Sequence, residues 1–439
     1  MTVRLPGGRL SIPAALRCGR PLHVGAGLNH RILGLTVRNF RTLTDVKLRL
    51  GSLTVMVGPN AAGKSNVLHA LELLGDVSRL GIERALDARG GFDVLAFRGG
   101  QRSVSRIAIG IEGIWSEFAS EESPDRYELS VSQRRLPEPR EHDRVLFRQE
   151  QLTQHPGAGA ATSLALASDQ LTLSSSLKDD GKPGPIDVER MASVLNQPVP
   201  LPRSSPSAHA AAVVTRHLEQ VRVFDPDVRL ARRPSPITGS GQRLHNDASN
   251  LADFLKSLWE HRSTREEDKG RRFVWEALLR DVRAVVPQIQ DIHLVDAPGR
   301  PDYISVELEE TSLRGRTRLE DASFGTVRLL SLLAIFHDPN PPLLTCIEEI
   351  DHGIHPHALE LLAGRLREAS RRAQFLVTTH SPAFVNELEP EEFVVCERGE
   401  DGASVIPALT ADEVRQVIEA SEGMPMGDLW FANTLGGGL

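Results

Sequence analysis

The sequence feature that most constrains the fold is the run "GPNAAGKS" at residues 58–65. It matches the pattern G-x-x-x-x-G-K-[ST], it follows the apolar run Leu53–Val57, and apolar residues at helical spacing come after it. This order predicts a buried strand, a glycine loop and a helix, which is the context that phosphate binding by backbone amides requires. An accidental glycine loop is the alternative, but it would not need the flanking strand and helix.

The residue types in this loop predict how a nucleotide would be held. Lys64 would reach the β- and γ-phosphates of ATP, and the Ser65 hydroxyl would ligate Mg²⁺. The expected cofactors are therefore ATP and Mg²⁺. The residues expected to contact the nucleotide from this loop are Gly58, Asn60, Gly63, Lys64, Ser65 and Asn66.

A second motif, "TCIEEIDHGIHPH" at residues 345–357, places two acids after a short apolar run. Ligands bind at the carboxyl ends of parallel strands. Glu348 there would hold Mg²⁺ through its water, and Glu349 would orient an attacking water. A transition-metal site is the alternative, made by His352, His355 and His357. No cysteine accompanies these histidines at ligand spacing, so the acids and Mg²⁺ are favoured.

Two shorter motifs complete the candidate site. "TTHSP" at residues 378–382 ends the next predicted strand, so sheet order would place His380 beside the acid pair, where an imidazole could sense the γ-phosphate. A structural histidine is the alternative. In "DASFGT" at residues 321–326, Ser323, Gly325 and the start of the following helix would form a second anion-binding nest. Alone, this last motif is a weak signal.

The order of elements predicts an α/β fold, because strands and helices alternate in the last third of the chain and favour a largely parallel sheet. The runs "SRIAIGIEGI" and "RYELSVS" predict paired antiparallel strands, residues 133–215 are interpreted as insertion and loop, and helices are expected at 250–261 and 271–286. The predicted domains are a poorly ordered tail (1–31), a first core part with the glycine loop and antiparallel strands (32–132), an insertion or helical lobe with loops (133–300), a second core part (301–408) and a C-terminal tail (409–439).

Composition excludes several classes of protein. The 439 residues are 40% hydrophobic and 25% charged, which is ordinary for a globular chain, and no apolar run reaches the length of about 18 residues that spans a membrane. The net charge of −7 argues against a protein that coats nucleic acid, although a local basic groove stays open. Three cysteines without metal-ligand spacing favour a reducing cytoplasm. The acid-free start of the chain is interpreted as a disordered tail or an early start codon, with a transit peptide as the alternative.

Together these motifs resemble the ABC-type ATPase core of the SMC, RecF and OLD group of P-loop NTPases. The similarity is greatest to small bacterial OLD-like and phage-defence ATPases without a nuclease domain. The segments that carry the match are "NFRTL" (39–43), "GPNAAGKSN" (58–66), "DASFGT" (321–326), "CIEEIDHGIHP" (346–356) and "TTHSP" (378–382). The resemblance implies an ABC-ATPase-like core with a mixed, largely parallel sheet, an antiparallel β subdomain and a helical insertion.

The resemblance also implies a head-to-tail dimer around two ATP molecules. Ser323 and Gly325 of one chain would meet the γ-phosphate that Lys64 of the other chain holds. Glu349 would be the general base, Glu348 the magnesium-side acid, and His380 the γ-phosphate switch residue. Gln101 is a candidate for the glutamine loop of the family.

The function expected from this resemblance is an ATPase whose ATP-driven dimerisation, or assembly into a higher oligomer, gates a separate effector protein in phage defence or toxin control. About 59 residues follow His380, fewer than a nuclease domain needs. A RecF-like DNA clamp is the alternative, and a transporter ATPase is disfavoured by the atypical signature. Basic groups at 232–233, 271–272 and 314–318 would be a DNA surface or merely solvated faces. The apolar end of the chain, with Met424, Met426, Trp430 and Phe431, would pack on its own core or dock the effector.

Overall fold

The computed structural model of this chain describes residues 31–100, 103–135, 144–157, 160–167, 170–175, 186–196, 206–238, 243–260, 269–421 and 423–436. The tail predicted at 1–31 lies outside these ranges except for Arg31, and so does Gln101. None of the helices in these ranges has the length and apolar character that crossing a membrane would need.

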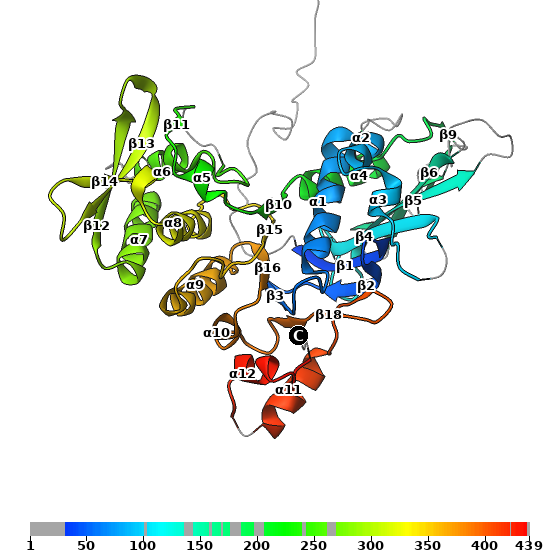
Figure 1. Cartoon of the computed structure of the whole chain (residues 1–439). Helices are drawn as coiled ribbons and strands as arrows, with labels where there is room; N and C mark the ends of the chain where they lie inside the picture. Colours follow the sequence, from blue (N-terminus) through cyan, green and yellow to red (C-terminus); the bar gives the residue numbers. More distant parts are fainter. Residues whose placement is uncertain are drawn as a thin grey trace, which may run out of the picture.

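A parallel sheet forms the centre of the molecule (Figure 1). Its strands follow the order β10 (Val221–Phe224), β15 (Leu344–Ile347), β16 (Gln374–Thr379), β3 (Leu53–Val57) and β17 (Phe393–Val395). Every residue of β3, β15 and β16 is buried, which explains why these strands are mostly apolar on both faces and show no polar–apolar alternation. The predicted parallel core is confirmed, since each neighbouring pair in this sheet runs parallel.

Alternate residues of the central strands face two separate cores. Met56 and Leu376 share one core with helix α1 (Lys64–Leu80) and with the antiparallel sheet described below. Val55 and Val377 share the other core with helices α8 (Phe324–Phe336) and α9 (Pro356–Ala369). Helix α8 is buried from its second turn to its end, as its almost wholly apolar sequence predicts. The glycine loop and the acid strand are thus anchored from both sides.

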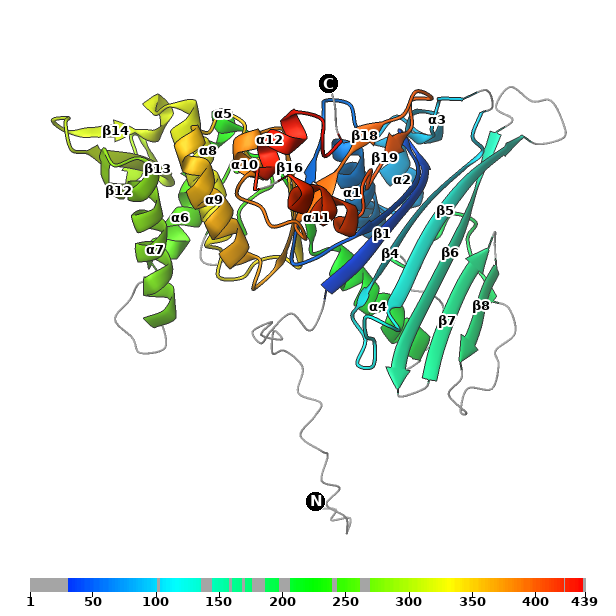
Figure 2. The ribbon, with the colours of Figure 1, turned by 90° about the horizontal axis from the view of Figure 1, so that it is seen from below.

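A curved antiparallel sheet lies beside the parallel one and bends around α1 (Figure 2). Its strands follow the order β2 (Leu43–Arg49), β1 (Arg31–Phe40), β4 (Arg106–Ile114), β5 (Asp125–Arg135), β6 (Arg144–Gly157), β7 (Ala160–Ala167), β8 (Gln170–Ser175) and β9 (Ile186–Asp187). The predicted pairing of "SRIAIGIEGI" with "RYELSVS" is confirmed as β4 with β5. The interpretation of 133–215 as insertion and loop was wrong for β6 to β9. Their alternating apolar residues, such as Leu164 and Leu166, stand among Gly, Ala and Ser residues that are typical of loops.

A third region carries the helices predicted after residue 250. Helices α6 (Leu251–Glu260) and α7 (Lys269–Val285) pack on a small sheet of β11 (Ser235–Pro236), β13 (Arg300–Glu310), β12 (Ile289–Ala297) and β14 (Arg316–Arg318). The segment 133–300 is therefore not one helical lobe. Its first part extends the antiparallel sheet, β10 joins the parallel sheet, and only the rest builds the helical region. The domain boundaries themselves stay predictions.

Short elements complete the described structure. They are α2 (Ile82–Asp87), α3 (Phe92–Leu95), α4 (Pro206–Leu218), α5 (Val228–Ala231), a 3-10 turn (Leu319–Asp321), α10 (Pro382–Val385), β18 (Glu397–Arg398), β19 (Ser404–Val405), α11 (Ala411–Ala420) and α12 (Met426–Phe431).

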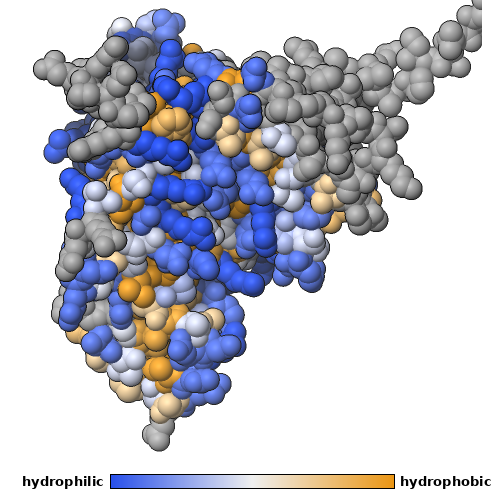
Figure 3. Space-filling view, turned by 90° about the vertical axis from the view of Figure 1, so that its right-hand side faces the viewer, coloured by the Kyte–Doolittle hydropathy of each residue, from blue (hydrophilic) through white to orange (hydrophobic). Residues whose placement is uncertain are grey.

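The C-terminal helix α12 packs on α10, which begins directly after the "THS" of the histidine motif. Met426 and Trp430 are buried in the core, so packing on the chain's own core is confirmed for these two. Met424 and Phe431 are 51% and 72% exposed, and a docking role for them stays a prediction. In Figure 3 hydrophobic residues gather on the lower part of the molecule, where the C-terminal elements lie.

Candidate functional site

The predicted site residues meet at the carboxyl ends of three neighbouring strands. The glycine loop follows β3, His380 follows β16, and Glu348 and Glu349 follow β15, in the sheet order β15–β16–β3. Carboxyl ends of parallel strands share one edge of a sheet. The expectation that sheet order places His380 beside the acids is confirmed, because His380 Nε2 lies 3.5 Å from Glu349 Oε1.

Two glycines of the loop occupy places where no other residue fits. A Cβ on Gly58 would lie 2.1 Å from the carbonyl oxygen of Cys396, and a Cβ on Gly63 would lie 2.1 Å from Ser404 Oγ. Gly63 also has a φ of +101°, which favours glycine, and it starts helix α1. No described side chain caps this helix start, so its first backbone amides are available to an anion.

The Lys64 ammonium is buried inside the loop. Its Nζ donates to the carbonyl oxygens of Gly58 (2.7 Å) and Pro59 (2.9 Å), and the side chain is only 5% exposed. Burial lowers the pKa of Lys64, whereas the nearby carboxylates of Glu349 and Glu348 oppose that shift. A buried cation surrounded by loop carbonyls and open amides is suited to receive phosphate oxygens.

Ser65 and Glu348 form an oxygen pair next to Lys64. The Ser65 hydroxyl donates to Glu348 Oε1 in a short hydrogen bond. Mg²⁺ is usually bound by one or two carboxylates together with phosphates and water. These two side chains therefore fit Mg²⁺, and the loop around them fits the phosphates of ATP.

Glu349 adopts an uncommon backbone conformation at the strand end, with a φ of +46°. Its N–H donates to Thr378 Oγ1 (2.9 Å), and its carboxylate stands between His380 Nε2 at 3.5 Å and His352 Nδ1 at 3.7 Å. The side chain is 43% exposed, so water reaches it. This acid is placed to act on a solvent molecule rather than to form a buried ion pair.

His380 connects the glycine loop to the acid. Its Nδ1 lies 2.9 Å from the carbonyl oxygen of Gly58, which requires a proton on Nδ1 because a carbonyl only accepts. Lys64 Nζ is 3.5 Å from the same nitrogen, but a protonated Nδ1 cannot accept from it, so we assign the bond to Gly58. The other nitrogen, Nε2, then faces Glu349.

A hollow of about 260 Å³ unites these residues. It is lined by Asn60, Ala61, Gly63, Lys64, Ser65, Asn66, Glu348, Glu349, Thr378, His380 and Arg398. A neighbouring hollow of about 650 Å³ shares Asn66 and Arg398 with it and adds Arg41 and Arg98. The two hollows together extend beyond the phosphate loop. The arginines Arg41, Arg98 and Arg398 line this extension.

Sequence reasoning missed two of these arginines as site residues. Arg398 donates to the carbonyl oxygen of Ala61 in the glycine loop (2.9 Å), and nothing in its sequence context indicated this. Nη1 of Arg41 lies 3.3 Å from Asn66 Oδ1 and 2.6 Å from His69 Nδ1. Its place in "NFRTL" was a signal, because that segment belongs to the family resemblance.

The signature residues stand apart from this hollow. Ser323 and Gly325 do not line it, and Ser323 is exposed, with its Oγ accepting from the N–H of Thr326 (3.1 Å). The signature instead packs against the turn that follows Glu349. A Cβ on Gly325 would lie 2.7 Å from the carbonyl oxygen of Gly353.

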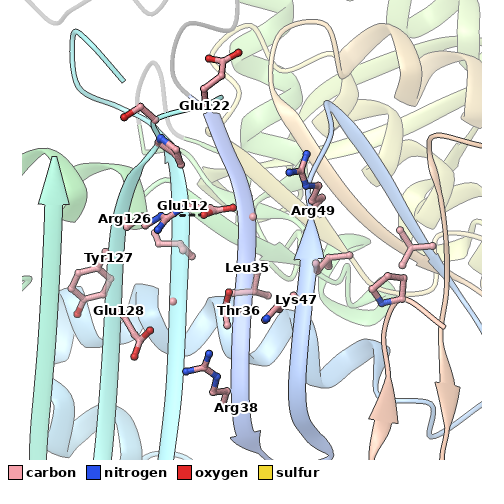
Figure 4. A pocket seen from close by; sticks show the side chains of 18 of the residues that line it. Leu35, Thr36, Arg38, Lys47, Arg49, Glu112, Glu122, Arg126, Tyr127 and Glu128 are labelled. Carbon is pink, nitrogen blue, oxygen red and sulfur yellow. Dashed lines mark ion pairs between the residues drawn. The ribbon is translucent and has the colours of Figure 1, made fainter. Parts of the chain in front are cut away.

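Two other places were considered as sites. Among the described residues, no group of three or more His, Cys, Asp or Glu side chains is arranged to hold a metal ion, and this includes His352, His355 and His357. A larger hollow of about 1100 Å³ lies on the outer face of the antiparallel sheet (Figure 4). Side chains of both charges line it, and Arg126 pairs there with Glu112 at 3.4 Å. None of the predicted site residues reaches it.

The chain is similar to known proteins in sequence and in fold. A family model described as "AAA domain, putative AbiEii toxin, Type IV TA system" matches residues 53–386, well over half of the chain. An OLD nuclease of Thermus scotoductus (strain ATCC 700910 / SA-01) is 59% identical over 44 residues, which are 10% of this chain and 8% of that protein.

Solved structures with a similar fold include an Smc head domain with a coiled coil and joint from Pyrococcus yayanosii. Its TM-score is 0.50 at 13% identity, and the match covers 90% of this chain and 100% of that one. The SMC head domain from Thermotoga maritima has a TM-score of 0.40 at 14% identity and covers 87% and 100%. At 13% identity, the similarity to the Pyrococcus yayanosii domain concerns the fold alone.

Proposed function

Because this chain belongs to the family described as AAA domain, putative AbiEii toxin, Type IV TA system, we propose that it hydrolyses ATP and that the ATP cycle gates a partner protein. The chain is an ATPase of the ABC, SMC and OLD type. One observation carries the hydrolysis proposal. The Lys64 ammonium, the Glu348 carboxylate and the Glu349 carboxylate converge on one hollow at the edge of the parallel sheet.

The binding step follows from the loop. Gly58, Asn60 and Gly63 let the backbone approach the phosphates, and the Lys64 ammonium exchanges its loop carbonyls for phosphate oxygens. Asn66 donates to Thr42 Oγ1 (2.7 Å), which ties the first turn of α1 to the segment after β1. Mg²⁺ bound by Ser65 and Glu348 would supply charge neutralisation on the phosphates.

The hydrolytic step is assigned to Glu349. In this proposal its exposed carboxylate accepts a proton from a water and directs that water at the γ-phosphate. His380 is the switch residue, since its ring spans from Gly58 in the loop to Glu349. A movement of the glycine loop on nucleotide binding would therefore be transmitted through His380 to Glu349.

A second copy of the chain would complete the site. Ser323 and Gly325 do not line the hollow of their own chain, and the Ser323 side chain is exposed at the start of α8. We place them against the nucleotide of a second copy, in a head-to-tail dimer. The N-terminus of α8 would then present its amides to the γ-phosphate.

The gated partner is proposed to be a separate effector protein in phage defence or toxin control. The family description, which names a putative toxin and a toxin–antitoxin system, supports this role. The exposed side chains of Met424 and Phe431 support a contact at the C-terminal segment, because exposed apolar groups mark interaction sites.

A DNA clamp is the second candidate, and one observation favours it. Four arginines from three separate parts of the sequence line one hollow of about 390 Å³ together with Glu307 and Glu320; they are Arg232, Arg233, Arg300 and Arg318. The side chains of residues 271 and 272 lie outside the described part of the structure. If DNA binds there, its affinity should fall steeply with salt concentration. If the protein does not bind duplex DNA even at low salt concentration, the clamp is excluded.

The hydrolysis proposal is tested with Glu349→Gln. We expect ATP to bind as in the wild type while phosphate release falls by about 10²–10⁴-fold, the usual contribution of a general base. Glu360→Gln, an exposed acid on α9, is the matched control and should hydrolyse normally. Unchanged phosphate release from Glu349→Gln would show that Glu349 is not the base.

A further inference from the structure

Arg328 is a buried cation in the second turn of α8, the helix that begins at the signature. Its side chain is only 3% exposed, although all its neighbours along this helix are apolar or small. Burying an arginine is costly unless its N–H groups find partners. The partners of Arg328 therefore indicate what the residue does.

Those partners are the backbone of the acid pair. Nη2 of Arg328 donates to the carbonyl oxygens of both Glu348 (3.1 Å) and Glu349 (2.8 Å). Nη1 lies 3.7 Å from Asp225 Oδ1, and Nε has no hydrogen-bond partner among the described residues. Burial lowers the pKa of Arg328, but guanidinium groups stay protonated in proteins. The Arg328 guanidinium thus holds main-chain carbonyl oxygens at the end of β15.

Glu349 needs such fixing, because a positive φ is unfavourable for a residue with a side chain. Such conformations persist only where the surroundings hold them. Thr378 Oγ1 holds the N–H of Glu349 from β16, and Arg328 holds its carbonyl oxygen from α8. The N–H of His352 also donates to this carbonyl oxygen (3.0 Å). Together these contacts hold the backbone of Glu349, whose carboxylate faces His380.

A second contact joins α8 to the same turn. The Phe324 ring lies 5.6 Å from the His352 ring, and His352 in turn stands 3.7 Å from Glu349 Oε2. Phe324 is next to Ser323, at the exposed end of the helix. The signature end of α8 is therefore in contact with the turn that follows Glu349.

We propose that Arg328 is the positioning residue for Glu349 and that it couples the signature of a chain to the base of the same chain. The proposal rests on the role proposed above for Glu349. When the signature meets the nucleotide held by a second copy, the movement of α8 reaches Glu349 through the Arg328 guanidinium. Hydrolysis in one site is thereby made to depend on nucleotide in the other.

The test compares Arg328→Met and Arg328→Lys in the full chain. Asp225 is 65% exposed, so removing its partner leaves a solvated carboxylate rather than a buried one, and the fold should survive. We expect Arg328→Met to lose about 10²-fold in turnover, the usual cost of a misplaced catalytic group, while ATP affinity changes by less than about threefold. Arg328→Lys keeps a positive charge and N–H donors on a single nitrogen, and it should regain part of the turnover.

A second measurement does not depend on hydrolysis. Hydrogen exchange of residues 346–352 should rise in Arg328→Met, while exchange in β3 stays unchanged. Wild-type turnover and exchange would overturn the proposal, as would a parallel loss of ATP affinity, turnover and melting temperature. If Glu349→Gln abolishes turnover and Arg328→Met does not, the coupling fails and the ATPase proposal stands. If Glu349→Gln has no effect, the base assignment fails, and exchange alone decides whether Arg328 holds the turn.

Discussion

His380 Nε2 lies 3.5 Å from Glu349 Oε1, while the Nδ1 of the same ring is bonded to the Gly58 carbonyl. One imidazole therefore links the loop after β3 to the acid after β15, across the strand that lies between them in the sheet. Its Nδ1 contacts the glycine loop, while its Nε2 faces the Glu349 carboxylate in the hollow. This linkage makes His380 a sensitive place to test the mechanism.

Replacing His380 should separate hydrolysis from binding. His380→Ala is expected to lower ATP turnover by about 10²-fold or more and to leave ATP affinity nearly unchanged, because Lys64 keeps both of its loop contacts. His380→Gln, which can still donate to the Gly58 carbonyl, should retain more activity. Phosphate release and equilibrium binding of ATP check this. His209→Ala, an exposed histidine on α4, is the control, and an equal loss in affinity and turnover for His380→Ala would contradict the prediction.

Two glycine-to-alanine changes should affect different properties: Gly63→Ala should abolish ATP binding, whereas Gly364→Ala should stabilise the fold. Gly63→Ala places a Cβ 2.1 Å from Ser404 Oγ at a φ of +101°, so we expect ATP binding to be lost. Gly364→Ala lies within α9 with nothing within 4 Å of the new Cβ. It should raise the free energy of unfolding by about 0.5–1 kcal/mol. Binding isotherms and urea midpoints measure both, and normal ATP affinity in Gly63→Ala would argue against the glycine loop as the phosphate site.

Glu150 should make stability depend on pH. It is fully buried in β6, and burial raises its pKa from 4.5 to about 7, while Arg148, 3.8 Å away, opposes the shift. The folded state therefore binds this proton more tightly than the unfolded state. The resulting stabilisation is fully present below about pH 4.5 and is lost as the pH rises through about 7.

The measurement for Glu150 is urea unfolding of the wild type and of Glu150→Gln between pH 5 and pH 8. The glutamine cannot titrate, so the variant should gain stability relative to the wild type across this range, by up to about 3 kcal/mol. Glu400→Gln, an exposed acid, should follow the wild type at every pH. Parallel profiles for wild type and Glu150→Gln would contradict the raised pKa.

Much of the parallel core could be predicted from the sequence, because its signals are local. Leu53–Val57 and the strand before Glu348 are short apolar runs with a loop motif or acids at their ends, and this is what buried parallel strands look like. The motif at residues 378–382 ends a further parallel strand, so it was expected at the same edge of the sheet as the glycine loop and the two acids. The helix after Phe324 was recognised for the same reason, as an apolar run without a polar face.

What could not be predicted depends on partners distant in sequence. Strands β7 and β8 carry only two leucines each among small and polar residues, and they are strands because β6 and β7 supply their hydrogen-bond partners. Arg328 was overlooked as a site residue, although a lone charge in "FGTVRLLSLLAIF" was a signal that it had buried partners. Which partners it had depended on the turn after β15, and no spacing rule gives that contact.

The sheet order also has a consequence for the ribosome-bound chain. Strand β3 pairs in the described structure with β16 and β17, whose residues are synthesised more than 300 positions later. At about 5–20 residues per second, translation leaves the apolar segment Leu53–Val57 without its neighbours for roughly 15–60 s. The nascent chain thus carries a complete glycine loop long before it has a place to bind a nucleotide. This strand, which is fully buried in the folded chain, is meanwhile open to chaperones or to misassembly.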